Sequence, residues 1–117
     1  QLPMEFLGPG LAADAALAPP PAEIPRDAPD LAAVARAANV LAAASRPLIV
    51  CGAGATRAGA GPGVRRLCLE HGVPVAGNSQ GRGLVPEDDE RSFAWPYMQS
   101  AAKDADAVLV LGARLKQ

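Results

Sequence analysis

The residues of this sequence best suited to chemistry lie in three glycine-containing turns. Two of the turns directly follow apolar runs, residues 48–51 and 107–111, and the third turn lies between those runs. Glycine lets a ligand approach the backbone closely, and arginine can hold a phosphate group through paired N–H groups. The pattern therefore indicates a site for the phosphate or adenosine group of a nucleotide. Its candidate binding residues are Gly52, Ala53, Gly54, Ala55, Gly81, Arg82, Gly83, Gly112, Ala113 and Arg114.

Two common nucleotide-binding motifs do not fit the first of these turns. A dinucleotide fingerprint requires a third glycine where Arg57 stands, and an acidic residue where the next apolar run ends at Gly77 and Asn78. A phosphate-binding P-loop requires a Gly-Lys-Ser/Thr sequence, which does not occur. The glycines could also serve only to make tight turns between strand and helix, so a purely structural role stays open.

The spacing of the residues does not bring together side chains that could act in covalent or acid–base catalysis. The sequence offers no nucleophile–base pair, no close carboxylate pair and no Cys/His cluster typical of a metal site. His71 falls in the last turn of an expected helix, where its charged form would suit the helix dipole. The acidic run at residues 87–90 is interpreted as a solvated loop. We therefore assign no catalytic and no metal-binding residue in this chain.

The elements that must position the three turns alternate between helix and strand. Helices are predicted to begin near Asp30, Pro62 and Pro96, residue types suited to helix starts. Strands are predicted over residues 48–51, 73–77 and 107–111. This order predicts an α/β fold with a parallel sheet and with residues 48–51 in its middle. Because the carboxyl ends of parallel strands share one edge, the three turns should converge there.

Composition and charge exclude several classes of protein. The chain has 117 residues and a net charge of −1, which gives no electrostatic reason to expect nucleic acid or an anionic membrane as partner. No apolar run approaches the roughly 18 residues of a membrane span. Cys51 and Cys68 lie in apolar settings and are predicted to be free, buried thiols of a cytoplasmic protein.

Proline content divides the chain. Seven of the twelve prolines lie in the first 29 residues, so we assign residues 8–29 to an extended linker. Residues 30–117 then form the domain that carries the three turns. The short alternating pattern in residues 1–7 is typical of a strand end that belongs to a preceding domain.

Four blocks of this sequence, taken together, resemble the central domain of thiamine diphosphate-dependent enzymes. This superfamily includes acetolactate synthase, oxalyl-CoA decarboxylase and 2-hydroxyacyl-CoA lyase, and the resemblance covers residues 31–117. Residues 2–7, LPMEFL, resemble more loosely the last strand of the pyrimidine-binding domain that precedes it. The four blocks are RPLIVCGAGA (46–55), HGVPV (71–75), GRGLVPED (81–88) and DADAVLVLGARL (104–115).

The resemblance implies a Rossmann-like, three-layer α/β/α fold, of which this chain holds about three of roughly six strands. In the family, thiamine diphosphate and Mg²⁺ lie between the pyrimidine and pyrophosphate domains, so we expect this chain not to bind them. The central domain binds FAD in acetolactate synthase and ADP in oxalyl-CoA decarboxylase, and it is empty in other members. The resemblance thus implies FAD, ADP or no ligand at the three turns, and it leaves the choice open.

We therefore expect the central domain of a thiamine diphosphate-dependent lyase or transferase, inactive by itself. Its expected partners are the remaining domains of the parent enzyme and further copies in a homo-oligomer. The alternatives are a nucleotide-binding α/β module without catalysis and a purely structural domain. The run at residues 107–111 carries no charge or proline, so we also expect an undefended sheet edge. The chain should then either self-associate through this strand or be only marginally stable.

Overall fold

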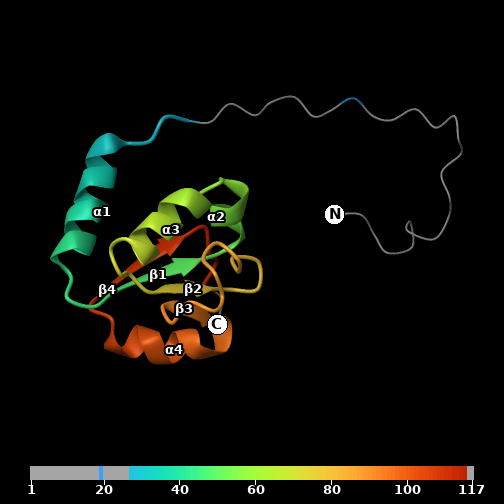
Figure 1. Cartoon of the computed structure of the whole chain (residues 1–117). Coiled ribbons are helices and arrows are strands. Elements are labelled where there is room, and N and C mark those ends of the chain that lie inside the picture. Colours follow the sequence, from blue (N-terminus) through green and yellow to red (C-terminus); the bar gives the residue numbers. More distant parts are fainter. Residues whose placement is uncertain (1–18, 20–26, 116–117) are drawn as a thin grey trace, which may run out of the picture.

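The computed structural model describes residue 19 and residues 27–115 (Figure 1). The predicted strand end at residues 1–7 and most of the predicted linker lie outside the described residues. The elements in chain order are α1 (Leu31–Ala43), β1 (Pro47–Cys51), α2 (Ala53–Arg57), α3 (Gly61–Leu69), β2 (Val75–Gly77), β3 (Ser92–Ala94), α4 (Trp95–Asp104) and β4 (Ala107–Leu111).

The strands form one parallel sheet in the order β3-β2-β1-β4. The predicted parallel α/β fold is therefore confirmed, and β1 lies between β2 and β4 as expected. β3 was not predicted, because its three residues are too few to show the periodicity of a strand. Its strand conformation depends on pairing with β2, where Val75 is opposite Ser92 and Gly77 is opposite Ala94.

Helices cover both faces of the sheet, with α3 on one side and α4 on the other (Figure 1). Alternate residues of β1 supply the two cores, since successive side chains of a strand point to opposite faces. Ile49 and Cys51 pack in the cluster that includes Val64 and Cys68 of α3. On the opposite face, buried side chains of β1 and β2 meet the inner side of α4. This arrangement is the three-layer order that the resemblance implied.

Both cysteines are free and buried, as predicted. Burial raises the pKa of the Cys51 thiol to about 11, so this thiol stays protonated at neutral pH. Burial also raises the pKa of Cys68, and the nearby Asp89 carboxylate adds to that shift. Neither thiol is therefore in the ionised form that reacts as a nucleophile.

Two elements on the β4 side of the domain leave apolar side chains in contact with solvent. In α1, Leu31 is 74% exposed and Val34 is 53% exposed. In β4 the burial alternates, with Val108 46% exposed and Val110 38% exposed. The strand is therefore covered on the face of Leu109 and Leu111, which pack against the core under α3, and open on the face of Val108 and Val110.

A single carboxylate joins the start of β1 to the start of β4. Asp106 accepts hydrogen bonds of 2.8 Å each from the backbone N–H groups of Ser45 and Arg46. Arg46 in turn donates from Nε to the backbone carbonyl of Asp104 at 2.5 Å. The hydrogen bonds from Arg46 and Ser45 lower the pKa of Asp106, since they stabilise its charged form.

Replacing Asp106 with alanine is expected to lower the melting temperature by about 4–8 °C at neutral pH, because two backbone N–H groups lose their acceptor. A carboxyl whose pKa is lowered by folding stabilises the protein above its unfolded pKa, and this contribution disappears as pH falls through the folded pKa. The difference from wild type should therefore vanish in acid. Thermal unfolding across a pH series measures it, with Asp104→Ala as control, since Asp104 supplies only its backbone carbonyl. A constant difference down to the lowest pH would contradict the assignment.

Candidate functional site

The three predicted turns meet at the carboxyl edge of the sheet. Gly52 donates its backbone N–H to the carbonyl of Leu111 at 2.9 Å, and Gly54 donates to the carbonyl of Gly112 at 3.0 Å. The turn after β2 joins them, because the N–H of Asn78 donates to the carbonyl of Cys51 at 3.0 Å. The convergence that the sequence predicted is therefore present.

Most of the glycines at this edge face protein backbone. A Cβ atom on Gly52 would lie 2.5 Å from Ala113 Cα, and one on Gly54 would lie 2.7 Å from Gly112 Cα. Gly112 also has φ of 57°, a conformation that side-chain-bearing residues rarely adopt. A Cβ atom on Gly81 would overlap the carbonyl of Cys51. These glycines therefore let the turns pack against one another.

A cavity of about 400 Å³ opens beside the packed turns, and we call it the carboxyl-edge cavity. Two of the predicted binding residues line it, Arg82 from the turn after β2 and Arg114 from the turn after β4. Arginines from separate parts of the chain thus reach one cavity. The full lining is Asn78, Ser79, Arg82, Ala94, Pro96 and Arg114.

The other predicted residues lie around this cavity without lining it. Gly81 and Gly83 line a smaller neighbouring cavity of about 70 Å³. Ala53 and Ala55 belong to the five-residue helix α2, which was not predicted, and Ala55 is buried in the core. Arg57 is exposed on α2 and does not line the carboxyl-edge cavity.

The turn after β2 is shaped by the side chain of Asn78. Its Oδ1 accepts hydrogen bonds from the backbone N–H groups of Gln80 at 3.1 Å and Gly81 at 3.0 Å. This local closure is a common use of asparagine in turns. Thr56 of α2 holds the same turn from the other side, since its hydroxyl donates to the carbonyl of Gln80 at 3.0 Å. Arg82 therefore starts from a fixed backbone position.

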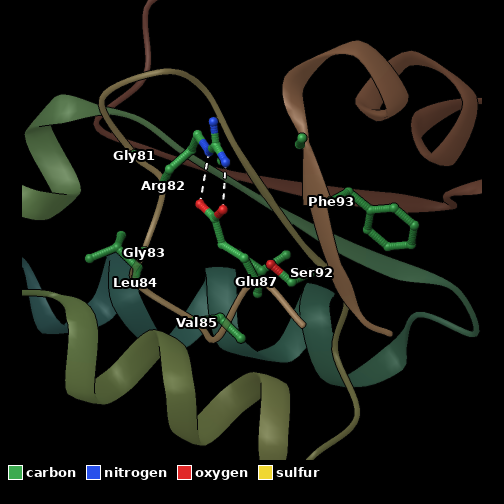
Figure 2. A pocket seen from close by; sticks show the side chains of 11 residues that line it. Gly81, Arg82, Gly83, Leu84, Val85, Glu87, Ser92 and Phe93 are labelled. Carbon is green, nitrogen blue, oxygen red and sulfur yellow. Dashed lines mark hydrogen bonds and ion pairs between the residues drawn. The ribbon is translucent and has the colours of Figure 1, made fainter. Parts of the chain in front are cut away.

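Arg82 lines both cavities and forms an ion pair with Glu87, which lines only the smaller one. Its Nε donates to Oε1 of Glu87 at 2.8 Å and its Nη2 donates to Oε2 at 2.5 Å (Figure 2). The hydrogen bond lowers the pKa of Glu87 and raises that of Arg82, so both groups are charged at neutral pH. Both side chains are about half exposed, at 53% and 49%. Such a pair contributes little to stability, because water competes for both partners.

The acidic loop contains a second ion pair that the sequence did not suggest. Asp89 accepts hydrogen bonds from the side chain of Arg91 at 2.8 and 2.7 Å. The arginine lowers the pKa of Asp89 to about 2. Glu87, Asp88 and Glu90 are exposed in this loop, as the interpretation of a solvated loop expects, whereas Asp89 is half-buried.

Sequence reasoning did not select four lining residues: Asn78, Ser79, Ala94 and Pro96. The available signal was that Asn78 and Ser79 follow directly after a predicted strand, where ligands of α/β proteins bind. Ala94 gave no such signal, because it ends the unpredicted strand β3. His71 lies beyond the end of α3, near Pro47 at the opposite edge of the sheet.

Two features, a metal-binding cluster and a membrane-spanning helix, are absent from the part of the chain that the structure describes. Residues 27–115 contain no group of three or more His, Cys, Asp or Glu side chains placed to hold a metal ion. None of the helices found among these residues has the length and apolar character needed to cross a membrane. At the carboxyl edge the cavity is lined by two guanidinium groups and by the small polar side chains of Asn78 and Ser79.

Comparison with known proteins agrees with this architecture. Residues 34–117 match the family model described as "Thiamine pyrophosphate enzyme, central domain". Human 2-hydroxyacyl-CoA lyase 1 is 32% identical over 91 residues, which is 74% of this chain and 15% of that protein. An acetolactate synthase large subunit of Mycobacterium tuberculosis is 35% identical over 80 residues, which is 68% of this chain and 14% of that protein.

A plant relative extends the comparison. The 2-hydroxyacyl-CoA lyase of Arabidopsis thaliana is 38% identical over 79 residues, which is 68% of this chain and 14% of that protein. The chain thus spans about a seventh of the length of these relatives. The family match extends from α1 to the end of the chain and includes both arginines of the carboxyl-edge cavity. The chain therefore belongs to the family of central domains of thiamine pyrophosphate enzymes.

Proposed function

We propose that this chain is the central domain of a longer thiamine pyrophosphate-dependent lyase or transferase, and that its carboxyl-edge cavity binds the diphosphate of an adenine nucleotide. The relatives named above, 2-hydroxyacyl-CoA lyases and an acetolactate synthase subunit, support the first part. The second part depends on the site itself. Both ADP and FAD carry a diphosphate, so the same site serves either ligand.

One observation carries the nucleotide proposal: Arg82 and Arg114, 32 positions apart in the sequence, line the same cavity. Planar guanidinium groups bind phosphate oxygens through paired N–H groups. Within the described residues Arg114 forms no ion pair, so its charge is available to a ligand. Two positive charges at the carboxyl edge of a parallel sheet suit an anionic ligand at the usual binding position of such folds.

Two further features support the same ligand. The helix α4 begins at this cavity, and its N-cap residue Ala94 makes no side-chain hydrogen bond to the first turn. The free N–H groups and the positive end of the helix dipole there favour negative charge. The cavity volume of about 400 Å³ falls within the range of about 300–1,000 Å³ typical of small-molecule sites.

The described residues offer no cluster of metal-binding side chains that would hold Mg²⁺. We propose that the cofactor and the metal ion are held by the other domains of the parent enzyme, and that the parent is a homo-oligomer. Two free, buried thiols fit the reducing environment of the cytoplasm.

A purely structural role is the second candidate, and the packing of the glycines favours it. Gly52, Gly54 and Gly112 contact each other's backbone and so need no ligand to explain them. The two candidates differ in what they require of the arginines. A structural domain has no use for Arg114, whereas a nucleotide-binding domain loses affinity without it.

Calorimetric titration with ADP, FAD and CoA tests the proposal on the full chain. Arg114→Gln is expected to weaken ADP binding about tenfold or more, because a charge-assisted hydrogen bond to phosphate is lost. Arg57→Gln is the matched control, since Arg57 is equally charged but lies outside the cavity. Saturable binding that Arg57→Gln leaves intact supports the site. Absence of binding by the folded wild-type chain, or equal losses in both variants, would favour the structural role.

A further inference from the structure

We propose that Glu87 is an internal competitor for the nucleotide site: it holds the Nε and Nη2 groups of Arg82 until an anionic ligand draws the guanidinium away. This inference rests on the proposed function, because it concerns the same carboxyl-edge cavity. It assigns to the acidic loop a role in setting the affinity of that cavity for phosphate groups. Glu87 itself lines the small cavity on the other side of Arg82.

The geometry of the ion pair is the first step. An arginine has five N–H groups, and its Nε and one terminal nitrogen form a fork that matches two oxygens of a carboxylate or a phosphate. Glu87 takes this fork, at 2.8 Å on Nε and 2.5 Å on Nη2. Figure 2 shows the remaining terminal nitrogen of Arg82 directed away from Glu87. A phosphate that enters the site can therefore bind only the N–H groups of Arg82 that Glu87 leaves free.

The second step is the exposure of the ion pair. It shows whether Glu87 competes with a ligand for Arg82 or only holds Arg82 in position. A carboxylate that only positions an arginine needs to be buried and fixed, so that a ligand cannot replace it. Here the side chains of Arg82 and Glu87 are 53% and 49% exposed, so the pair is weak and solvated. A diphosphate brings more negative charge than a carboxylate and can take over the fork.

The charge of the site is the third step. Arg82 and Arg114 contribute two positive charges to the carboxyl-edge cavity, and Glu87 cancels one of them at short range. The same carboxylate repels a bound phosphate. Both effects lower the affinity for anions, and both grow with the negative charge of the ligand. Glu87 therefore lowers the affinity of this site most for multiply charged ligands such as diphosphates.

The test uses inorganic pyrophosphate as probe and the folded full chain, with affinity measured by calorimetry. Glu87→Gln is expected to bind pyrophosphate about fivefold more tightly than wild type, because the competing charge is gone. Glu90→Gln is the matched control: it removes the same charge from the same loop at an exposed position outside both cavities. It should leave the affinity almost unchanged.

A double-variant cycle separates competition at Arg82 from a general effect of charge. In an Arg82→Gln background the Glu87→Gln substitution should change the affinity by less than about twofold, since no fork remains to compete for. Binding that Arg114→Gln weakens but Glu87→Gln leaves unchanged or weakens would overturn this inference and leave the proposed function standing. No pyrophosphate binding by any folded variant would overturn both.

Discussion

Replacing Gly52 with alanine is expected to destabilise the folded chain by about 2–4 kcal/mol. The new Cβ atom would lie 2.5 Å from both Ala113 Cα and the carbonyl oxygen of Gly112. These are backbone atoms, and the hydrogen bond from Gly52 to Leu111 holds the two turns together at 2.9 Å. The overlap can be relieved only if the turn after β1 moves away from the turn after β4. Urea unfolding followed by circular dichroism measures the loss.

Gly63→Ala is the matched control, and it is expected to change stability in the opposite direction. Gly63 lies inside α3, and no heavy atom comes within 4 Å of a Cβ atom built there. Alanine in an exposed helical position stabilises by about 0.5–1 kcal/mol relative to glycine. If Gly52→Ala were as stable as Gly63→Ala, the close packing of the turns at the carboxyl edge would be wrong.

The full chain is expected to self-associate through the outer edge of β4. Among the described residues β4 pairs only with β1, so one row of its backbone N–H and C=O groups is free. The strand contains no charge or proline to defend that edge, and Val108 and Val110 are partly exposed. Val110→Lys is expected to raise the dissociation constant at least about tenfold, because strand pairing would bring two lysines together. Sedimentation across a concentration series measures it.

Val40→Lys provides the comparison for this second prediction. Val40 is 64% exposed on α1, so the substitution adds the same charge to another apolar surface residue. If the chain associates through β4, the Val40→Lys variant should have the same dissociation constant as wild type. A wild-type chain that stays monomeric at high concentration, or equal effects of both lysines, would show that the edge of β4 is not the contact.

The sheet could be predicted because the residues of its main strands themselves show the apolar pattern of a buried strand. The run from Leu48 to Cys51 is apolar throughout and ends at Gly52, which is enough to indicate a strand buried on both faces. The short strand β3 could not be predicted, since its conformation depends on hydrogen bonds to β2. The helix α2 was hidden for a similar reason, because a five-residue helix has too few positions to show an apolar stripe.

The candidate site was predictable in position and less so in composition. The glycines marked the carboxyl edge correctly, but their packing against Gly112, Ala113 and Cys51 depends on contacts between distant turns. Arg82 and Arg114 were identified because they lie in the glycine-containing turns, where an arginine can reach a phosphate group. Glu87 was interpreted as a solvated acid, since its distance of five residues from Arg82 does not reveal a bidentate pair.

If Arg82 and Arg114 form one anion site at the carboxyl edge, an amide NMR titration of the ¹⁵N-labelled chain with ADP will show saturable shift changes. These changes are expected in the turns after β2 and β4 and at the start of α4, with the largest near Ser79, Ala94 and Arg114. In Arg114→Gln the same changes should need about tenfold more ADP or more. Absence of saturable changes, or changes concentrated near Ser45 and Arg46 at the opposite edge, would contradict the single anion site.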